Sequence, residues 1–322
     1  MPIVKSSEYS AALFFRNAHA QTVYPSVFRK VDGIFYSRER IHTPDDDFID
    51  VDWSRVGARR LTIALHGLEG DSGRSYMRGM ARAINRRGWD AMCLNFRGCS
   101  GEPNRQARMY HSGETGDLSL VISRVLANDQ YDDLTLVGFS LGGNVVLKYL
   151  GERGSGIDKR IRGAVAISVP CDLGSCSIRL QELGNWAYSR RFLKMLRRKL
   201  TEKKTLYPDV MDISTLDSVK TLSEFDDRFT APLHGFRDAR DYYQRSSSKQ
   251  FLGGINIPCL LLNAADDPFL TPECFPHDEA RSSSSLYLET PRHGGHVGFV
   301  SFDANGEYWS ETRATQFLAE TC

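Results

Sequence analysis

The sequence of 322 residues lacks any apolar run close to the roughly 20 residues that a membrane-spanning helix needs. Residues 1–8 show no basic stretch followed by an apolar one, so we expect no signal peptide. The seven cysteines are scattered and include no Cys-x-x-Cys pair. We therefore expect reduced thiols in a cytoplasmic protein, with Cys171 and Cys176 as buried small residues and with no bound metal or cofactor.

An excess of charge of either sign is also missing. The 41 Lys and Arg residues nearly balance the 40 Asp and Glu residues, which gives a formal charge of +1. This balance excludes attraction of the whole surface to nucleic acid, and we expect no nucleic-acid partner. The composition is 41% hydrophobic and 25% charged, as in ordinary globular proteins, and the length suits one domain spanning residues 1–322.

Short apolar runs alternate with amphipathic helical patterns along most of the chain. This alternation predicts an α/β fold with a mostly parallel central sheet and helices on both faces. Ahead of it, residues 33–36 and 48–53 are expected to form a hairpin around the turn at 43–47. The alternation breaks at about 172–253, which predicts a helical lid insertion between two strands. The expected buried strands are 61–65, 89–95, 134–137, 164–169, 257–262 and 285–288.

Gly138-Phe139-Ser140-Leu141-Gly142 directly follows an expected strand and opens an expected helix. A strand-to-helix turn this tight forces the serine into a strained conformation with its hydroxyl above the sheet. The two glycines remove side chains that would collide with the neighbouring strand and helix. In this context the motif favours Ser140 as a nucleophile over an incidental serine at a helix start.

A nucleophilic serine needs a base and an orienting acid, which in such folds follow it in the order acid, then histidine. After the strand at 257–262 come Asp266 and Asp267, and after the strand at 285–288 come His293 and His296. Both pairs fall at the carboxyl edge of the sheet, as Ser140 does. We favour Asp267 because the following proline keeps it extended, and His296 because two glycines precede it. Asp266 and His293 are the alternatives.

Acyl transfer also requires hydrogen-bond donors for the oxyanion that develops on the carbonyl oxygen. The loop at 66–70, His-Gly-Leu-Glu-Gly, follows an expected strand and is similar to loops that donate one such amide. The other donor is the amide of the residue after the nucleophile. We therefore expect the backbone amides of Leu68 and Leu141 to be the oxyanion donors, and His66 to anchor the loop through a hydrogen bond.

Further motifs accompany these loops along the chain. The full set is 17–22 (NAHAQT), 66–70 (HGLEG), 95–101 (NFRGCSG), 111–115 (HSGET), 138–143 (GFSLGG), 263–268 (NAADDP) and 293–299 (HGGHVGF). Taken together, these motifs resemble the alpha/beta-hydrolase superfamily and, more narrowly, its YheT-like branch. The resemblance implies a Ser-Asp-His hydrolase of carboxylic esters and maps the triad onto Ser140, Asp267 and His296. It leaves the substrate open.

We therefore expect a cytoplasmic carboxylesterase for short or medium acyl chains, acting on a small or lipid-like ester. The alternatives are a lipase, a thioesterase or an alcohol acyltransferase with the same triad, or a non-catalytic binding protein. In the insertion, residues 186–204 combine apolar positions at near-helical spacing with eight Lys and Arg residues. The simplest interpretation is a solvated surface helix. A weak contact with an anionic membrane surface is the second interpretation, and a local nucleic-acid patch is the third.

Overall fold

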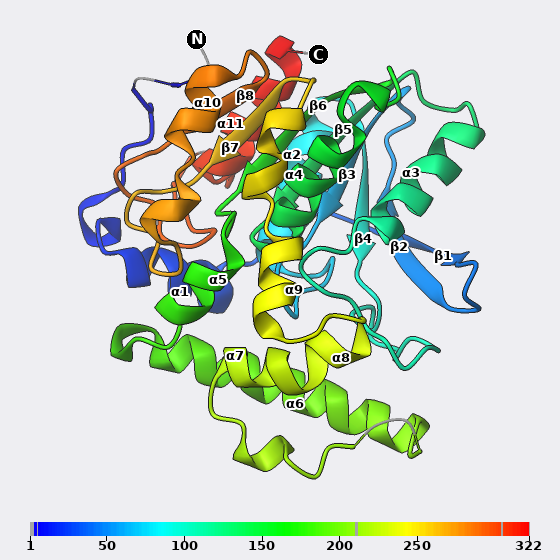
Figure 1. Cartoon of the computed structure of the whole chain (residues 1–322). Coiled ribbons are helices and arrows are strands. Elements are labelled where there is room, and N and C mark those ends of the chain that lie inside the picture. Colours follow the sequence, from blue (N-terminus) through cyan, green and yellow to red (C-terminus); the bar gives the residue numbers. More distant parts are fainter. Residues whose placement is uncertain (1–2, 5, 210–211, 304, 322) are drawn as a thin grey trace.

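The computed structural model describes residues 3–4, 6–209, 212–303 and 305–321, so Met1, Pro2 and Cys322 lie outside it. An eight-stranded sheet forms the centre of the molecule, in the order β1-β2-β4-β3-β5-β6-β7-β8 (Figure 1). The strands are β1 Ser37–His42, β2 Phe48–Ser54, β3 Arg60–Leu65, β4 Asp90–Asn95, β5 Asp133–Phe139, β6 Ile161–Ile167, β7 Cys259–Leu262 and β8 Leu286–Glu289.

The six strands from β3 to β8 all pair in parallel. β2 pairs antiparallel with both β1 and β4. Helices cover both faces of this sheet. One apolar core joins α3 and α4 to the sheet, and a second core joins α2 and α11 to the opposite face. This arrangement confirms the predicted fold class.

The helices follow the strands in the alternation that the apolar pattern predicts. They are α1 Ala18–Phe28, α2 Ser75–Arg86, α3 Gly116–Ala127, α4 Leu141–Arg153, α5 Leu173–Arg179, α6 Trp186–Leu206, α7 Leu222–Phe225, α8 Ala231–Leu233, α9 Ala239–Ser246, α10 His277–Ser282 and α11 Trp309–Thr321. Short 3-10 helices lie at Leu13–Phe15, Gly154–Gly156, Leu183–Asn185, Leu216–Ser218, Lys249–Gly254 and Pro272–Cys274, and a π-helical turn lies at Asp226–Thr230.

The hairpin at the start of the sheet differs from its prediction. Its turn is at 43–47 as expected, but the first strand is the polar β1 and not residues 33–36. Arg38 and Arg40 of β1 stand opposite Asp52 and Asp50 of β2, and each guanidinium makes a bidentate pair with its partner's carboxylate. Cross-strand ion pairs therefore hold this edge strand, which carries little apolar pattern.

Between β6 and β7 the described chain forms only helices and loops, in the region where the sequence predicts an insertion. In Figure 1, α6, α7 and α8 lie below the sheet, beyond the carboxyl ends of the strands, whereas the 3-10 helix Lys249–Gly254 packs beside α4. Leu193, Leu196 and Leu200 of α6 pack into a separate apolar core with residues of α7 and of the π-helical turn. The insertion therefore has its own core, and the apolar face of α6 is buried in it.

Two lysines of the basic segment 186–204 contact the rest of the chain, so this face of the helix is not fully solvated as expected. Lys199 pairs with Glu69, and Lys203 donates hydrogen bonds to the carbonyl oxygens of Asn104 and Gln106. Their ammonium groups link the insertion to loops of the main sheet. Spacing alone gave no signal for these contacts, because both lysines lie within a run of exposed cations.

The six described cysteines are free thiols, and Cys171 and Cys176 are buried, as predicted. None of the described helices is long and apolar enough to cross a membrane.

Candidate active site

Ser140 stands at the sharp turn between β5 and α4. Its backbone has φ 52° and ψ −117°, a conformation that costs a non-glycine residue about 1–3 kcal/mol. Close packing enforces the turn. A Cβ atom on Gly138 would lie 2.4 Å from the carbonyl oxygen of Gly142, and one on Gly142 would lie 2.6 Å from that of Leu65. The glycines predicted to permit this turn are therefore required by it.

His296 lies in a glycine-rich loop that follows β8 and is held by the N-terminal helix α1. The His296 amide donates to the Thr22 hydroxyl over 2.9 Å. Gly295 has φ 54°, and a Cβ atom there would lie 2.4 Å from the carbonyl oxygen of Ala18. Residues 17–22 thus position the histidine loop, which gives that early motif a physical role.

The structure brings the three predicted side chains together. His296 Nε2 lies 2.9 Å from Ser140 Oγ, and His296 Nδ1 lies 2.9 Å and 3.1 Å from the two carboxylate oxygens of Asp267. The Asp267 side chain has no exposed surface, and it accepts a further hydrogen bond from the Phe269 amide over 2.9 Å. In this geometry an imidazole bridges a hydroxyl and a buried carboxylate.

The two alternative residues pair with each other. Asp266 Oδ2 lies 3.2 Å from His293 Nδ1, and Asp266 Oδ1 accepts the Gly295 amide proton over 2.9 Å. This second pair fastens the loop that carries His296. Asp266 and His293 therefore have a supporting position beside the first pair, with no contact to Ser140.

The loop at 66–70 lies against Ser140, as a Cβ atom on Gly67 would be 3.2 Å from Ser140 Cβ. Phe96 donates its amide proton to His66 Nε2, which leaves Nδ1 as the donor to the Gly67 carbonyl oxygen at 2.7 Å. Burial lowers the pKa of His66 to about 3, so this anchor is neutral. Among the described residues, the amides of Leu68 and Leu141 donate no hydrogen bond, and both residues line the cavity at Ser140.

Two hollows meet at Ser140 and His296. One, the apolar cavity, has a volume of about 130 Å³, runs between the sheet edge and the insertion and is lined mainly by apolar side chains. The other is a wider groove of about 680 Å³, bordered by residues of α1, α2 and α6. Ser140 is therefore reachable from the groove on one side and from the apolar cavity on the other.

Glu69 adds a buried ion pair to this site that sequence reasoning missed. Its carboxylate lies 2.7 Å from Lys199 of α6 and accepts a hydrogen bond from the Tyr110 hydroxyl over 2.8 Å. Burial lowers the pKa of Lys199, but Cys99 and Glu69 together raise it above its ordinary value. The pair joins the 66–70 loop to the insertion. The motif HGLEG contained the acid, but nothing in the sequence indicated its partner.

Replacement of Glu69 by glutamine is expected to lower the free energy of unfolding by about 3 kcal/mol, because Lys199 stays buried without its counter-charge. Chemical denaturation of the purified variant measures this. Glu102→Gln is the matched control, since Glu102 is 58% exposed and its pair with Arg40 is worth at most about 1 kcal/mol. Equal losses in the two variants would contradict a special role for the buried pair.

The sequence model of the alpha/beta hydrolase fold matches residues 63–303 of the chain. The chain belongs to the alpha/beta-hydrolase fold family. Within this family it is 36% identical over 321 residues to "Putative esterase YheT" of Escherichia coli (strain K12), covering 97% of the chain and 93% of that protein. This alpha/beta hydrolase therefore falls in the YheT-like branch.

More distant relatives of this alpha/beta hydrolase carry lipid-hydrolase names. A monoacylglycerol lipase of Saccharomyces cerevisiae is 30% identical over 89% of the chain and 64% of that lipase. The human phospholipase ABHD3 is 28% identical over 93% of the chain and 75% of that protein. Among solved structures, the Pyrococcus furiosus esterase Pf2001 shares the fold with a TM-score of 0.60 and 18% identity, over 89% of the chain and 92% of the esterase.

Proposed function

We propose that the protein is a serine carboxylesterase in which Ser140, His296 and Asp267 form the catalytic triad. The esterase, phospholipase and lipase names of its relatives assign carboxylic ester hydrolysis as the class of reaction. The observation that carries the triad is the pair of 2.9 Å contacts from the His296 ring to Ser140 Oγ and to Asp267. A base of this kind is what a neutral serine hydroxyl needs to become a nucleophile.

The geometry supports a two-step reaction. Ser140 Oγ attacks the acyl carbonyl while His296 Nε2 takes its proton, and Asp267 holds the Nδ1–H tautomer and stabilises the imidazolium. The amides of Leu68 and Leu141 are proposed as donors to the oxyanion, a role worth roughly 3 kcal/mol for each donor. His296 then gives its proton to the departing alcohol oxygen. Water repeats the cycle on the acyl-enzyme and releases the acid.

We assign the acyl chain to the apolar cavity and the alcohol group to the wider groove. The alcohol has to leave and water has to enter while the acyl group is still attached to Ser140, and the groove offers the more open path. A cavity of about 150 Å³ holds a benzene molecule. The cavity of about 130 Å³ therefore supports an acyl portion of about six carbons, within the predicted short or medium range.

The cellular setting of this reaction stays a prediction. We propose a cytoplasmic enzyme whose insertion, residues 172–253, covers the acyl cavity as a lid within a single domain. A weak contact of residues 186–204 with anionic lipid is tested by sedimentation with anionic vesicles at low and high salt. The absence of salt-sensitive binding would end that interpretation.

The test of the proposed function is hydrolysis of p-nitrophenyl esters of increasing acyl length by the purified protein. We expect kcat/KM to be greatest for acyl chains of about four to eight carbons and to fall for longer chains, because the cavity is small. Added ethanol distinguishes the acyltransferase alternative: the esterase releases free acid, whereas a transferase forms the ethyl ester in preference. No turnover of any ester would contradict the proposed function.

A further inference from the structure

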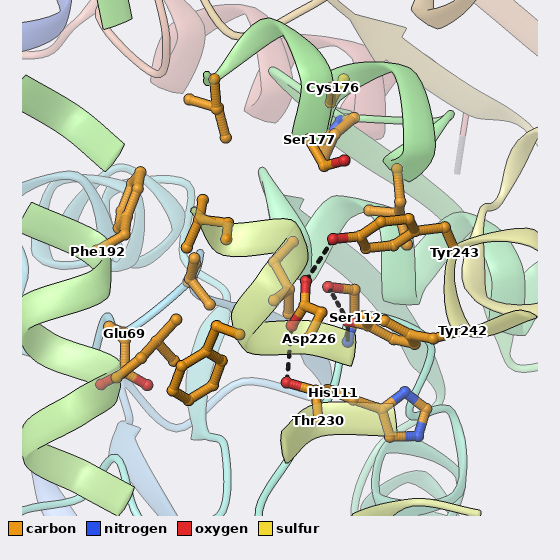
Figure 2. A pocket seen from close by; sticks show the side chains of 18 of the residues that line it. Glu69, His111, Ser112, Cys176, Ser177, Phe192, Asp226, Thr230, Tyr242 and Tyr243 are labelled. Carbon is orange, nitrogen blue, oxygen red and sulfur yellow. Dashed lines mark hydrogen bonds between the residues drawn. The ribbon is translucent and has the colours of Figure 1, made fainter. Parts of the chain in front are cut away.

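The insertion contributes both apolar and polar side chains to the walls of the apolar cavity (Figure 2). Leu173, Phe192 and Phe225 are among the apolar side chains of its walls. Asp226, in contrast, places a carboxyl group inside it, on the π-helical turn. Asp226 borders this cavity and is absent from the groove that also reaches Ser140. The carboxyl group therefore faces the space that we assign to the acyl chain.

The Asp226 carboxyl is held by two hydroxyl donors. Tyr243 donates to Oδ2 and Thr230 to Oδ1, each over 2.7 Å, as the dashed lines in Figure 2 show. Burial raises the pKa of Asp226 to about 6, although both hydroxyl groups oppose this shift. At neutral pH most molecules therefore carry an Asp226 carboxylate. A carboxylate has about four lone-pair sites, and two stay open here for a further donor.

No cation neutralises this carboxylate, since Asp226 forms no ion pair with any residue that the structure describes. His234 also lines the cavity, and neither of its buried ring nitrogens has a hydrogen-bond partner within the described part of the chain. Burial lowers the pKa of His234 to about 4, so its ring is neutral and offers one donor and one acceptor. The cavity thus contains unused hydrogen-bonding capacity from two side chains.

Tyr243 links the π-helical turn to α9 through its hydrogen bond to Asp226, but the bond does not require a charged acceptor. Enclosing a carboxylate without a cation costs free energy that an apolar side chain at the same position would not. The turn that presents it, Asp226–Thr230, is π-helical, a rare conformation that recurs at functional sites. Asp226 has no contact with Ser140, His296 or Asp267. These features point to recognition of a ligand and not to the chemical step.

We propose that Asp226 determines specificity by accepting a hydrogen bond from a hydroxyl group at the distal end of the substrate's acyl chain. The inference rests on the proposed function, in which the apolar cavity holds that chain. A hydroxyl group suits the site better than an ammonium group, because a neutral group crosses the apolar walls at a smaller desolvation cost. The substrate class is then a hydroxyacyl ester, with the hydroxyl remote from the carbonyl.

Matched pairs of p-nitrophenyl esters test this. The 6-hydroxyhexanoate is compared with the heptanoate, and the 8-hydroxyoctanoate with the nonanoate, so that only a terminal hydroxyl replaces a methyl group. We expect the wild-type ratio of kcat/KM, hydroxy ester over plain ester, to exceed that of Asp226→Leu by about tenfold or more, since a hydrogen bond to a charged group is lost. Asp226→Asn keeps the size and folding of the site and is expected to lower the ratio by about threefold or more.

Asp227→Asn is the control, because Asp227 is its exposed neighbour on the same turn and loses the same charge. Its ratio is expected to match the wild type. Equal ratios in the wild type, Asp226→Asn and Asp226→Leu would overturn the proposal. Ratios that fall equally in Asp226→Asn and Asp227→Asn would also overturn it, because the effect would then be one of general charge.

A binding measurement tests this proposal independently of the proposed function. Titration calorimetry of Ser140→Ala with methyl 6-hydroxyhexanoate and methyl heptanoate requires no turnover. We expect tighter binding of the hydroxy ester by about tenfold, and loss of that difference in the double variant with Asp226→Leu. If the wild type cleaves no ester, the proposed function fails while this measurement still decides the role of Asp226. Equal affinities for the two esters in Ser140→Ala would overturn the inference.

Discussion

Replacement of Ser140 by alanine is expected to lower kcat for p-nitrophenyl hexanoate by about a million-fold, to the rate that binding and oxyanion stabilisation alone supply. The variant lacks Ser140 Oγ, which lies 2.9 Å from His296 Nε2. KM is expected to change little, because the small hydroxyl contributes little to ground-state binding. Steady-state kinetics on the purified variant measures both constants.

The fold of the Ser140→Ala variant is expected to remain intact. The side chain of Ser140 makes one described hydrogen bond, to His296, and the strained turn is set by the packing of Gly138 and Gly142. We therefore expect the variant to unfold at nearly the same temperature as the wild type, although its kcat is lost. Retention of activity within about tenfold of wild type, in a protein that unfolds normally, would exclude Ser140 as the nucleophile.

Replacement of Asp267 by asparagine is expected to lower kcat by about ten-thousand-fold. The asparagine amide donates to Nδ1 of His296 and so stabilises the tautomer that carries its proton on Nε2. In that tautomer Nε2 cannot accept the proton of Ser140. Because the side chain keeps its shape, the 2.9 Å contact between the ring and the serine is expected to survive in a structure of the variant.

The chain provides a matched control at the neighbouring residue. Asp266 also pairs with a histidine, His293, and undergoes the same change of charge in Asp266→Asn. We expect that variant to lose at most about tenfold in kcat, through loosening of the loop that Asp266 fastens at Gly295. A loss in Asp266→Asn as large as that in Asp267→Asn would show that the acid has been assigned to the wrong residue.

These two aspartates show which parts of the site can be predicted from the sequence. The strand, turn and helix around Ser140 are local features, and the glycine pattern encodes them directly. Asp267 and His296 could be selected because loops at the carboxyl ends of parallel strands converge on one edge of the sheet. The proline and glycine positions favour one member of each pair, and the structure places His296 beside Ser140 and Asp267 beside His296.

Other features depend on contacts between distant segments and escaped prediction. β1 carries little apolar pattern, so the sequence places this strand at residues 33–36, and ion pairs with β2 help to fix its register. Lys199 stands among solvated cations in the sequence, and its pairing with Glu69 depends on how the insertion folds back.

The measurement that tests the central claim most directly is the site of covalent labelling by a fluorophosphonate, mapped by mass spectrometry of peptides. These reagents react with a serine that an adjacent base has activated. We predict that the label appears on Ser140 in the wild type and is absent from Ser140→Ala, with Asp267→Asn labelled far more slowly. Equal labelling of the wild type and Ser140→Ala, or a label on a different residue, would contradict the proposed triad.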